Sequence, residues 1–251
     1  MTTQLFAPGG YRFIPGVFQY SGGAAAEPGY GIERVTFRTP VPLVQGFERA
    51  AAVIEARGRP LTAFCACELR SPAPFTDAGF RGFNETYVET LARWGIYDAA
   101  TRTNPVARSN VCPEIDPPAG PSFHAFSFTV PSDDKGPTFV VAGSGEAREG
   151  GASYRERTVR WGETSPEAMR EKAIFVLGEM ERRLKLLGCD WSRTTATQVY
   201  TVHDLYPFLA DEIVPRGAAR SGLTWHFCRP PVQGLEYEMD CRGVAAEHCE
   251  S

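Results

Sequence analysis

The longest periodic pattern of apolar residues lies between Thr164 and Gly188. Apolar side chains recur there at three- and four-residue spacing, which is typical of an amphipathic helix. We expect a helix over 165–187, with a capping box formed by Thr164 and Glu167 and a stop at Gly188. Its apolar face is formed by Met169, Ala173, Val176, Leu177, Met180, Leu184 and Leu187.

Shorter apolar runs on either side of this helix predict strands. The segment 138–147, TFVVAGSGEA, is an apolar strand that ends in glycines, and 157–163 is interpreted as its hairpin partner. After the helix, 194–202 predicts a strand and 204–214 predicts a short irregular helix. The segment 217–243 then predicts a closing pair of strands around a proline-bearing turn.

The first half of the chain repeats this order of elements. A hairpin is expected from 11–23 and 31–40, and a helix over 43–58 ends at Gly58 as the later helix ends at Gly188. A strand, a second helix and terminal strands are expected over 60–70, 80–95 and 104–130.

A repeated tripeptide supports this internal repeat. Ala-Arg-Ser occurs at 107–109 and again at 219–221, each time just before the final strands of its half. Together with the shared order of elements, it indicates a duplicated unit. The expected fold class is α+β, with two tandem halves that each form a mixed sheet covered on one face by helices. We expect these halves at 1–130 and 138–251, joined by the polar, proline-bearing segment 131–137.

Composition argues against several classes of function. The chain has 251 residues, a net charge of −4 and a pI of about 5.7, so nucleic acid is not an expected partner. No apolar run approaches the ~20 residues that span a membrane, and the N-terminus lacks the pattern of a signal peptide. Seven cysteines without a CxxC pair and four scattered histidines argue against a zinc site. We therefore expect a reduced, cytoplasmic protein without a metal or other cofactor.

The closing segment carries the candidate chemistry. Glu236, Glu238 and Asp240 alternate along one predicted strand, so their carboxylates face the same side. They form either a solvated outer face or a site where neighbouring carboxylates and burial raise the pKa of one acid toward neutrality. Such an acid can donate a proton and then accept one. A small carboxylate substrate would then need local arginines, because arginine offers a carboxylate two donors.

The segment 138–244 resembles the RidA/YjgF family of enamine and imine deaminases. The resemblance rests on FVVAGSGEA, on the helix and strand that follow, and on ARSGLTWHFCRPPVQGLEYEMDCRGV. This last stretch looks like the family's closing Arg-Ser, proline hairpin and Glu-x-Glu strand. The tandem halves and the FCRPP motif also resemble the chorismatases. The RidA-like resemblance implies a trimer with sites at subunit junctions, so two halves per chain imply a pseudo-hexamer or a monomer with internal junctions.

Two registers are open for the substrate-binding arginine that the resemblance implies. Arg220 is favoured by the repeated Ala-Arg-Ser, whereas Arg229 takes this role in a chorismatase-like register. The acidic pair is either Glu236 with Glu238 or Glu238 with Asp240. Glu238 belongs to both pairs and is therefore the first candidate for the catalytic acid.

Other candidates for substrate binding lie on both halves. Cys228 alternates with His226 on one strand face, and it is either a site residue or a small core residue. If neither Arg220 nor Arg229 holds the anion, Arg81 and Arg108 of the first half are candidates across a junction.

The histidine of the first half is a further candidate. Aligning Val130 with Val244 places His124 and Phe126 where the second half has acids. The first half is then degenerate, and it supports or lends walls to one working site in the second half.

Three classes of function follow. The first is a hydrolytic deaminase of a small unsaturated amino carboxylate, such as an aminomuconate-type compound, which releases ammonia. The second is a chorismatase-like hydrolase or lyase acting on an enolpyruvyl substrate, which releases pyruvate. The third is a ligand-binding module without catalysis. Both reactions begin when an acid protonates a vinyl carbon and water attacks the resulting cation.

Overall fold

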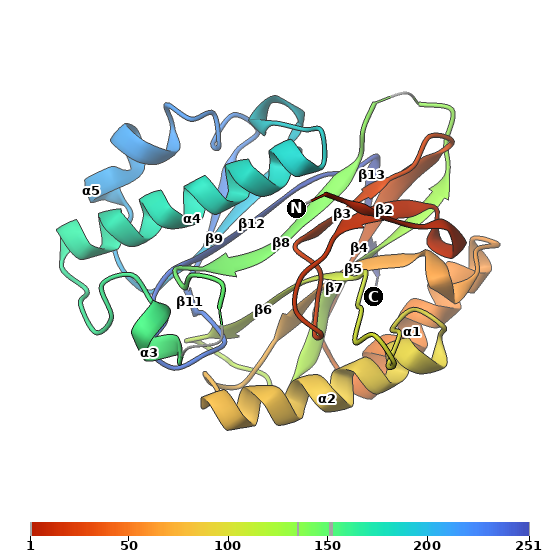
Figure 1. Cartoon of the computed structure of the whole chain (residues 1–251), viewed down its shortest axis with the longest axis horizontal. Coiled ribbons are helices and arrows are strands. Elements are labelled where there is room, and N and C mark those ends of the chain that lie inside the picture. The colour runs from red at the N-terminus through yellow and green to blue at the C-terminus, as the bar shows by residue number, and fades with distance from the viewer. Residues whose placement is uncertain (1, 135, 151–152, 251) are drawn as a thin grey trace.

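Two β-sheets lie between two layers of helices in the computed structural model, which describes residues 2–134, 136–150 and 153–250 (Figure 1). The seven-stranded sheet has the order β1 (Gln4–Phe6), β2 (Tyr11–Ile14), β3 (Gly23–Ala26), β8 (Phe139–Gly145), β12 (Glu238–Gly243), β9 (Ala196–Tyr200), β10 (Leu223–His226). The six-stranded sheet has the order β11 (Cys228–Arg229), β6 (Ala107–Pro113), β5 (Phe64–Arg70), β7 (Ser122–Pro131), β4 (Tyr30–Pro42), β13 (Ala246–Glu250). The α-helices are α1 (Leu43–Ala56), α2 (Asp77–Arg93), α3 (Tyr154–Arg157), α4 (Pro166–Leu186) and α5 (Tyr206–Phe208).

Two of the predicted helix patterns, 43–58 and 165–187, produce the expected helices. α1 and α4 form close to their predicted bounds, because one face of each is apolar. The N-cap of α4 is Ser165, whose side chain accepts a hydrogen bond from the Ala168 N–H, so the predicted capping box at Thr164 is wrong by one residue. Gly188 follows the helix with φ of 75°, a left-handed conformation that glycine adopts at little cost.

Both sheets contain the same four-stranded unit. The strand order is β6-β5-β7-β4 in the first half and β10-β9-β12-β8 in the second. In each unit the first two strands are parallel and the other neighbours are antiparallel. The strand of each unit that comes first along the chain is also followed by a long helix: α1 comes after β4, and α4 comes after β8. The α+β class with two similar halves is therefore confirmed.

The ends of the chain cross between the halves. The N-terminal strands β1 to β3 extend the sheet of the second half, and the C-terminal β13 extends the sheet of the first. β3 pairs with β2 and β8, so the predicted hairpin of 11–23 with 31–40 is wrong. The segment Gly23–Ala26 consists of small residues without alternation, which allow close approach between strands. A Cβ on Gly23 would lie only 2.9 Å from the carbonyl oxygen of Val140.

Two other predicted strand pairs are also wrong. Within the described segment 157–163 no strand forms; Ser153 caps the short helix α3, and a single bridge joins Ala147 to Thr158. The strands predicted in 217–243 do not pair with each other, because β10 and β12 lie on opposite sides of β9. β11 instead joins β6 of the first half. The alternation within a strand does not specify its partner.

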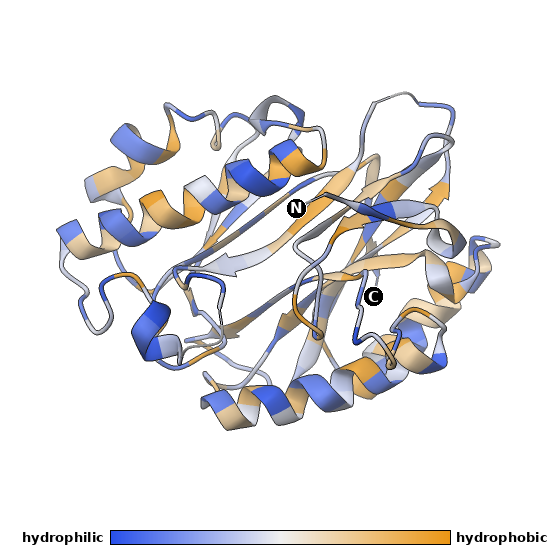
Figure 2. Ribbon diagram, viewed as in Figure 1, coloured by the Kyte–Doolittle hydropathy of each residue, from blue (hydrophilic) through white to orange (hydrophobic). Residues whose placement is uncertain are grey.

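Apolar cores lie between each sheet and its helices. α4 and α5 cover β8, β9 and β12, and α1 and α2 cover β5 and β7 (Figure 1). Figure 2 shows hydrophilic and hydrophobic segments alternating along α2 and α4, as expected for helices with one buried face. The two sheets meet where β6 contacts β8, and many buried polar groups lie there. In the described ranges, no helix is both long and apolar enough to cross a membrane.

Candidate functional site

A cavity of about 260 Å³ lies beside β6 and β8, where the two halves meet. The first half contributes β6, the start of α2 and the segment 14–22, and the second half contributes β8, β12, α3 and α4. A cavity of this size suits a small organic ligand. Its charged and hydroxyl-bearing residues are Tyr20, Arg108, Ser144, Glu149, Tyr154, Arg157, Arg182, Arg183 and Glu238.

Glu238 begins β12 and lines this cavity. It is 4% exposed, and its carboxyl group has no hydrogen-bond partner within the described ranges. Burial raises its pKa well above the ordinary value, and the nearby carboxylates of Asp240 and Glu146 raise it further, against the opposing charges of Arg108 and Arg183. Glu238 therefore stays protonated at a higher pH than an ordinary glutamate, as a general acid requires.

Arg108 reaches the cavity from the first half. Its guanidinium is buried beside aromatic rings, 4.6 Å from the ring centroid of Tyr87 and 5.2 Å from that of Tyr20. Nη2 donates to Asn84 Oδ1 at 2.6 Å, whereas Nη1 is buried and has no partner among the described residues. No carboxylate in the described part of the chain pairs with it. A bound anion would supply the acceptor that this donor lacks.

Two further arginines reach the cavity from the helices of the second half. Arg183 of α4 is 7% exposed, and its Nη1 donates to the carbonyl oxygen of Ala142 at 3.1 Å. Arg157 of α3 lies over the ring of Tyr154, with Cζ 3.9 Å from the centroid. The Nε of each arginine is buried, and neither Nε has a partner in the part of the chain that the structure describes. Tyr20 lies close enough to both for their charges to act on its hydroxyl.

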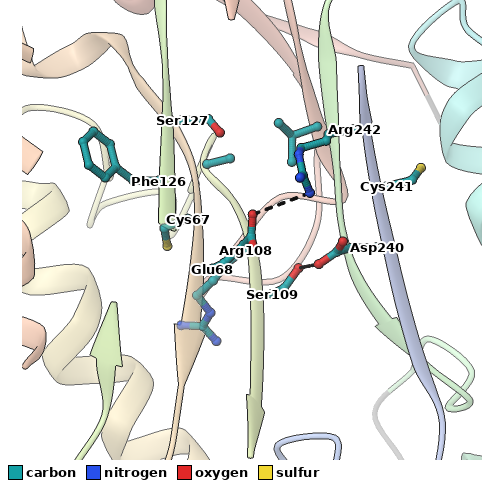
Figure 3. A pocket seen from close by; sticks show the side chains of 11 residues that line it. Cys67, Glu68, Arg108, Ser109, Phe126, Ser127, Asp240, Cys241 and Arg242 are labelled. Carbon is teal, nitrogen blue, oxygen red and sulfur yellow. Dashed lines mark hydrogen bonds and ion pairs between the residues drawn. The ribbon is translucent and has the colours of Figure 1, made fainter. Parts of the chain in front are cut away.

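Asp240 belongs to a hydrogen-bond network between the sheets. Its carboxylate accepts hydrogen bonds from Gln198 Nε2 and from the Tyr200 hydroxyl, both at 2.8 Å. It also accepts one from the Ser109 hydroxyl, and Figure 3 shows these two side chains pointing toward each other. Ser109 comes from the first half and Asp240 from the second, so the network joins them. Burial raises the pKa of Asp240, and the Glu68 carboxylate raises it further.

Glu68 forms the ionic part of the same network. Arg34 donates to its two oxygens from Nε at 2.6 Å and from Nη2 at 3.0 Å. Arg242 lies opposite, with Nη1 4.0 Å from Glu68 Oε1 (Figure 3). Burial alone would raise the pKa of Glu68, but the charge and hydrogen bonds of Arg34, together with the charge of Arg242, hold it well below the usual range. The carboxylates of Asp240 and Glu68 are thus hydrogen-bonded to other side chains, unlike the carboxyl group of Glu238.

Glu236 lies just before β12 and outside the cavity. It pairs with His203 Nε2 at 2.8 Å and with Arg229 Nη1 at 3.5 Å. Arg229 also pairs with Glu114 at 2.9 Å. Glu236 and Arg229 thus form a partly exposed ion-pair cluster, and neither lines the cavity with Glu238.

A buried ion pair holds the segment that leads into Glu238. Glu146 and Lys172 are both 0% exposed, and Lys172 Nζ lies 3.2 Å from Glu146 Oε1. Glu146 also accepts hydrogen bonds from the backbone N–H groups of Glu236 at 2.7 Å and Tyr237 at 3.2 Å. The pair therefore links α4 and the end of β8 to the start of β12.

The other candidates from the sequence lie elsewhere. Arg220 is exposed in the turn before β10 and does not line the cavity. Cys228 is buried against Val111 and Tyr200 in a small apolar cluster. Burial raises the pKa of the Cys228 thiol. Within the described ranges, no three His, Cys, Asp or Glu side chains gather in a way that could hold a metal ion.

His226 and His124 lie together between the sheets, with ring centroids 6.5 Å apart. His226 Nε2 is 3.0 Å from Gln198 Oε1, and its ring stacks on Tyr200 at 5.0 Å between centroids. Burial lowers the pKa of His226 to about 4 and that of His124 to about 3. Both rings are therefore neutral at neutral pH.

The predicted alignment of Val130 with Val244 does not hold. Phe126 packs in the core under α1 and α2, whereas Asp240 faces the opposite sheet. Because successive side chains of a strand face opposite sides, a shift of one residue reverses every side chain. The pairing of β7 with β5 is irregular around His124, which is how that ring reaches the space between the sheets.

Sequence reasoning missed several residues of the site. Arg183 and Lys172 lie on the apolar face of α4, Arg183 three residues after Met180. A buried charge on an apolar helical face is a signal that the sequence does contain. Arg157 lies in the single helical turn of α3, and Tyr20 lies in a loop. Neither segment is long enough for a periodic pattern to identify these residues.

The family of the chain follows from comparison with known proteins. The family model described as 2-aminomuconate deaminase CnbZ matches residues 3–248. The chain belongs to this family. A 2-amino-5-chloromuconate deaminase from Comamonas testosteroni is 55% identical over 245 residues, which cover 97% of each chain. The expectation of an aminomuconate-type deaminase is therefore confirmed at the level of the family.

Similar solved structures include a chorismatase and a YjgF protein. A chorismatase has a TM-score of 0.49 and 14% identity, covering 92% of this chain and 79% of that chain. The YjgF gene product of E. coli has a TM-score of 0.30 and 14% identity, covering 43% of this chain and 80% of that chain. At these TM-scores the likeness carries no argument about chemistry.

Proposed function

We propose that the chain is a hydrolytic deaminase that converts an aminomuconate-type enamine and water into the 2-oxo acid and ammonia, with Glu238 as acid and base. One observation carries the proposal. Glu238 is a buried carboxyl group without a hydrogen-bond partner in the described residues, and it faces a cavity that also contains unpaired arginines. The family of the chain supports the class of reaction.

Each step uses the proton of Glu238. The neutral carboxyl group donates its proton to the enamine carbon, and the nitrogen lone pair forms the C=N bond of an iminium ion. Glu238, now a carboxylate, accepts a proton from the water that attacks the iminium carbon. Glu238 then gives its proton to the amino group of this adduct, which leaves as ammonia, while the hydroxyl oxygen forms the C=O bond and returns its proton to Glu238. The elevated pKa of Glu238 favours the first step and does not prevent the second.

The neighbouring groups support this chemistry from both halves. Arg108 binds a carboxylate of the substrate through the donor that lacks a partner, so the first half contributes to the site instead of being only structural. Asp240 acts through its charge, which keeps the pKa of Glu238 raised. The trimer implied by the RidA-like resemblance and the cytoplasmic location stay predictions.

The test is replacement of Glu238 by glutamine, which keeps the shape but cannot transfer a proton. We expect Glu238→Gln to lower kcat for ammonia release from 2-aminomuconate by about 10²–10⁴-fold. The matched comparison is Glu236→Gln, two residues away in the exposed ion-pair cluster, which should stay within a few-fold of wild type. If the two variants show the reverse order, with both folded by circular dichroism, the assignment of Glu238 is wrong.

A further inference from the structure

We infer that Arg183, together with Arg157 of the same cavity, forms a carboxylate subsite separate from that of Arg108, so that the site selects substrates with a carboxylate at each end. The inference rests on the proposed function and deepens it, because it assigns the residues that distinguish a dicarboxylate from a monocarboxylate.

The guanidinium of Arg183 is anchored on one side only. Its Nη1 donates to the carbonyl oxygens of Ala142 at 3.1 Å and Gly143 at 3.5 Å. Its Nε is buried without a partner, and its Nη2 has no hydrogen bond within the described ranges. Nε and Nη2 form one edge of the guanidinium, which is the edge that a carboxylate can bind with both oxygens. Gly22 lies next to this edge: a Cβ built on Gly22 would be 3.7 Å from Arg183 Nε.

The two arginines approach Glu238 from different layers of the molecule. Arg108 lies against α2, and Arg183 lies on α4 on the other side of the sheets (Figure 1). Both lie near enough to Glu238 for their charges to lower its pKa, and all three line the same cavity. A six-carbon dicarboxylate would therefore place one end at each arginine and its unsaturated chain beside the acid.

The adjacent residue provides a matched contrast. Arg182 also lies at the cavity, but its Nη2 is 2.8 Å from Glu179 and 3.2 Å from Glu149, so its charge is already paired. Arg157 has no carboxylate partner among the described residues. Only the unpaired arginines leave positive charge for a second carboxylate.

The experiment compares two stable probes by isothermal titration calorimetry. Muconate carries a carboxylate at each end of a six-carbon diene, and sorbate has the same chain with a methyl group in place of one carboxylate. The wild-type chain should bind muconate at least about tenfold more tightly than sorbate, the effect of one charge-assisted interaction. Arg183→Gln should remove most of this preference, while Arg182→Gln should keep it.

Each outcome decides the matter. A wild type without a preference for muconate, including one that binds neither probe, overturns the inference, as does a preference that persists in folded Arg183→Gln. If Arg183→Gln fails to fold, Arg157→Gln is the deciding variant, and an unchanged preference there overturns it as well. The proposed function fails separately: the wild type would then prefer muconate yet release no ammonia from 2-aminomuconate.

Discussion

Gly143 is the position where the smallest change to the chain should have the largest effect on Glu238. It lies on β8, and a Cβ built on it would come closer than 3.0 Å to Glu238 Oε1 and within 3.2 Å of the Cα of Ser109 on β6. Backbone atoms of β6 cannot yield easily, so the carboxyl group has to move. We therefore expect Gly143→Ala to displace the acid without removing it.

The displacement needed to restore ordinary van der Waals contact is on the order of 1 Å. A misplacement of this size in a catalytic group costs about 10²-fold in rate, which corresponds to ~2.7 kcal/mol of transition-state stabilisation. Crowding between the strands should also lower the free energy of unfolding by about 1–3 kcal/mol. The variant should therefore stay folded but lose most of its kcat/KM.

The assay is ammonia release from 2-aminomuconate, together with urea unfolding followed by circular dichroism. Gly145→Ala is the matched control on the same strand, because the nearest atom to its Cβ is the flexible Cδ1 of Leu235 at 3.1 Å. It should keep activity within a few-fold of wild type. If Gly143→Ala is folded and its kcat/KM is as high as that of Gly145→Ala, then Glu238 is not the reactive acid in the position beside Gly143, and the reasoning is refuted.

Two further predictions concern stability. Lys172→Met leaves the Glu146 carboxylate buried without its cation, so the free energy of unfolding in urea should fall by about 3–5 kcal/mol; a loss below ~1 kcal/mol would show that the pair is dispensable. His226 and His124 have folded-state pKa values of about 4 and about 3, below the ordinary ~6.5 of an unfolded chain. Between the folded and the unfolded pKa values, the histidines of the unfolded chain bind protons that those of the folded chain do not. The free energy of unfolding should therefore fall as the pH falls from ~6.5 to about 4. Thermal unfolding across this range should show a smaller decline in His226→Gln, and an equal decline in both proteins would contradict the burial of the ring.

Much of the candidate site depends on contacts that one strand's pattern does not contain. The alternation of Glu238 and Asp240 is present in the sequence, and both do face the opposite sheet. Their different roles depend on partners: Asp240 meets Gln198 and Tyr200 on β9, whereas Glu238 meets a cavity. Arg220 has the same local motif as Arg108, yet it lies in an exposed turn, because β10 begins three residues later and at the sheet edge, whereas β6 already begins at Ala107.

The sequence by itself determined the elements and their repetition, because helical periodicity, glycine stops and a duplicated order are local properties. It also singled out Glu238 as the candidate acid, because Glu238 belongs to both possible acidic pairs. Only the tertiary structure decided which half supplies the arginines. The strands at both ends of the chain cross to the opposite sheet, and β6 meets β8, so Arg108, Arg183 and Glu238 come together from three separate elements. Burial between those elements then raises the pKa of Glu238, and burial is a property of the packed molecule and not of any segment.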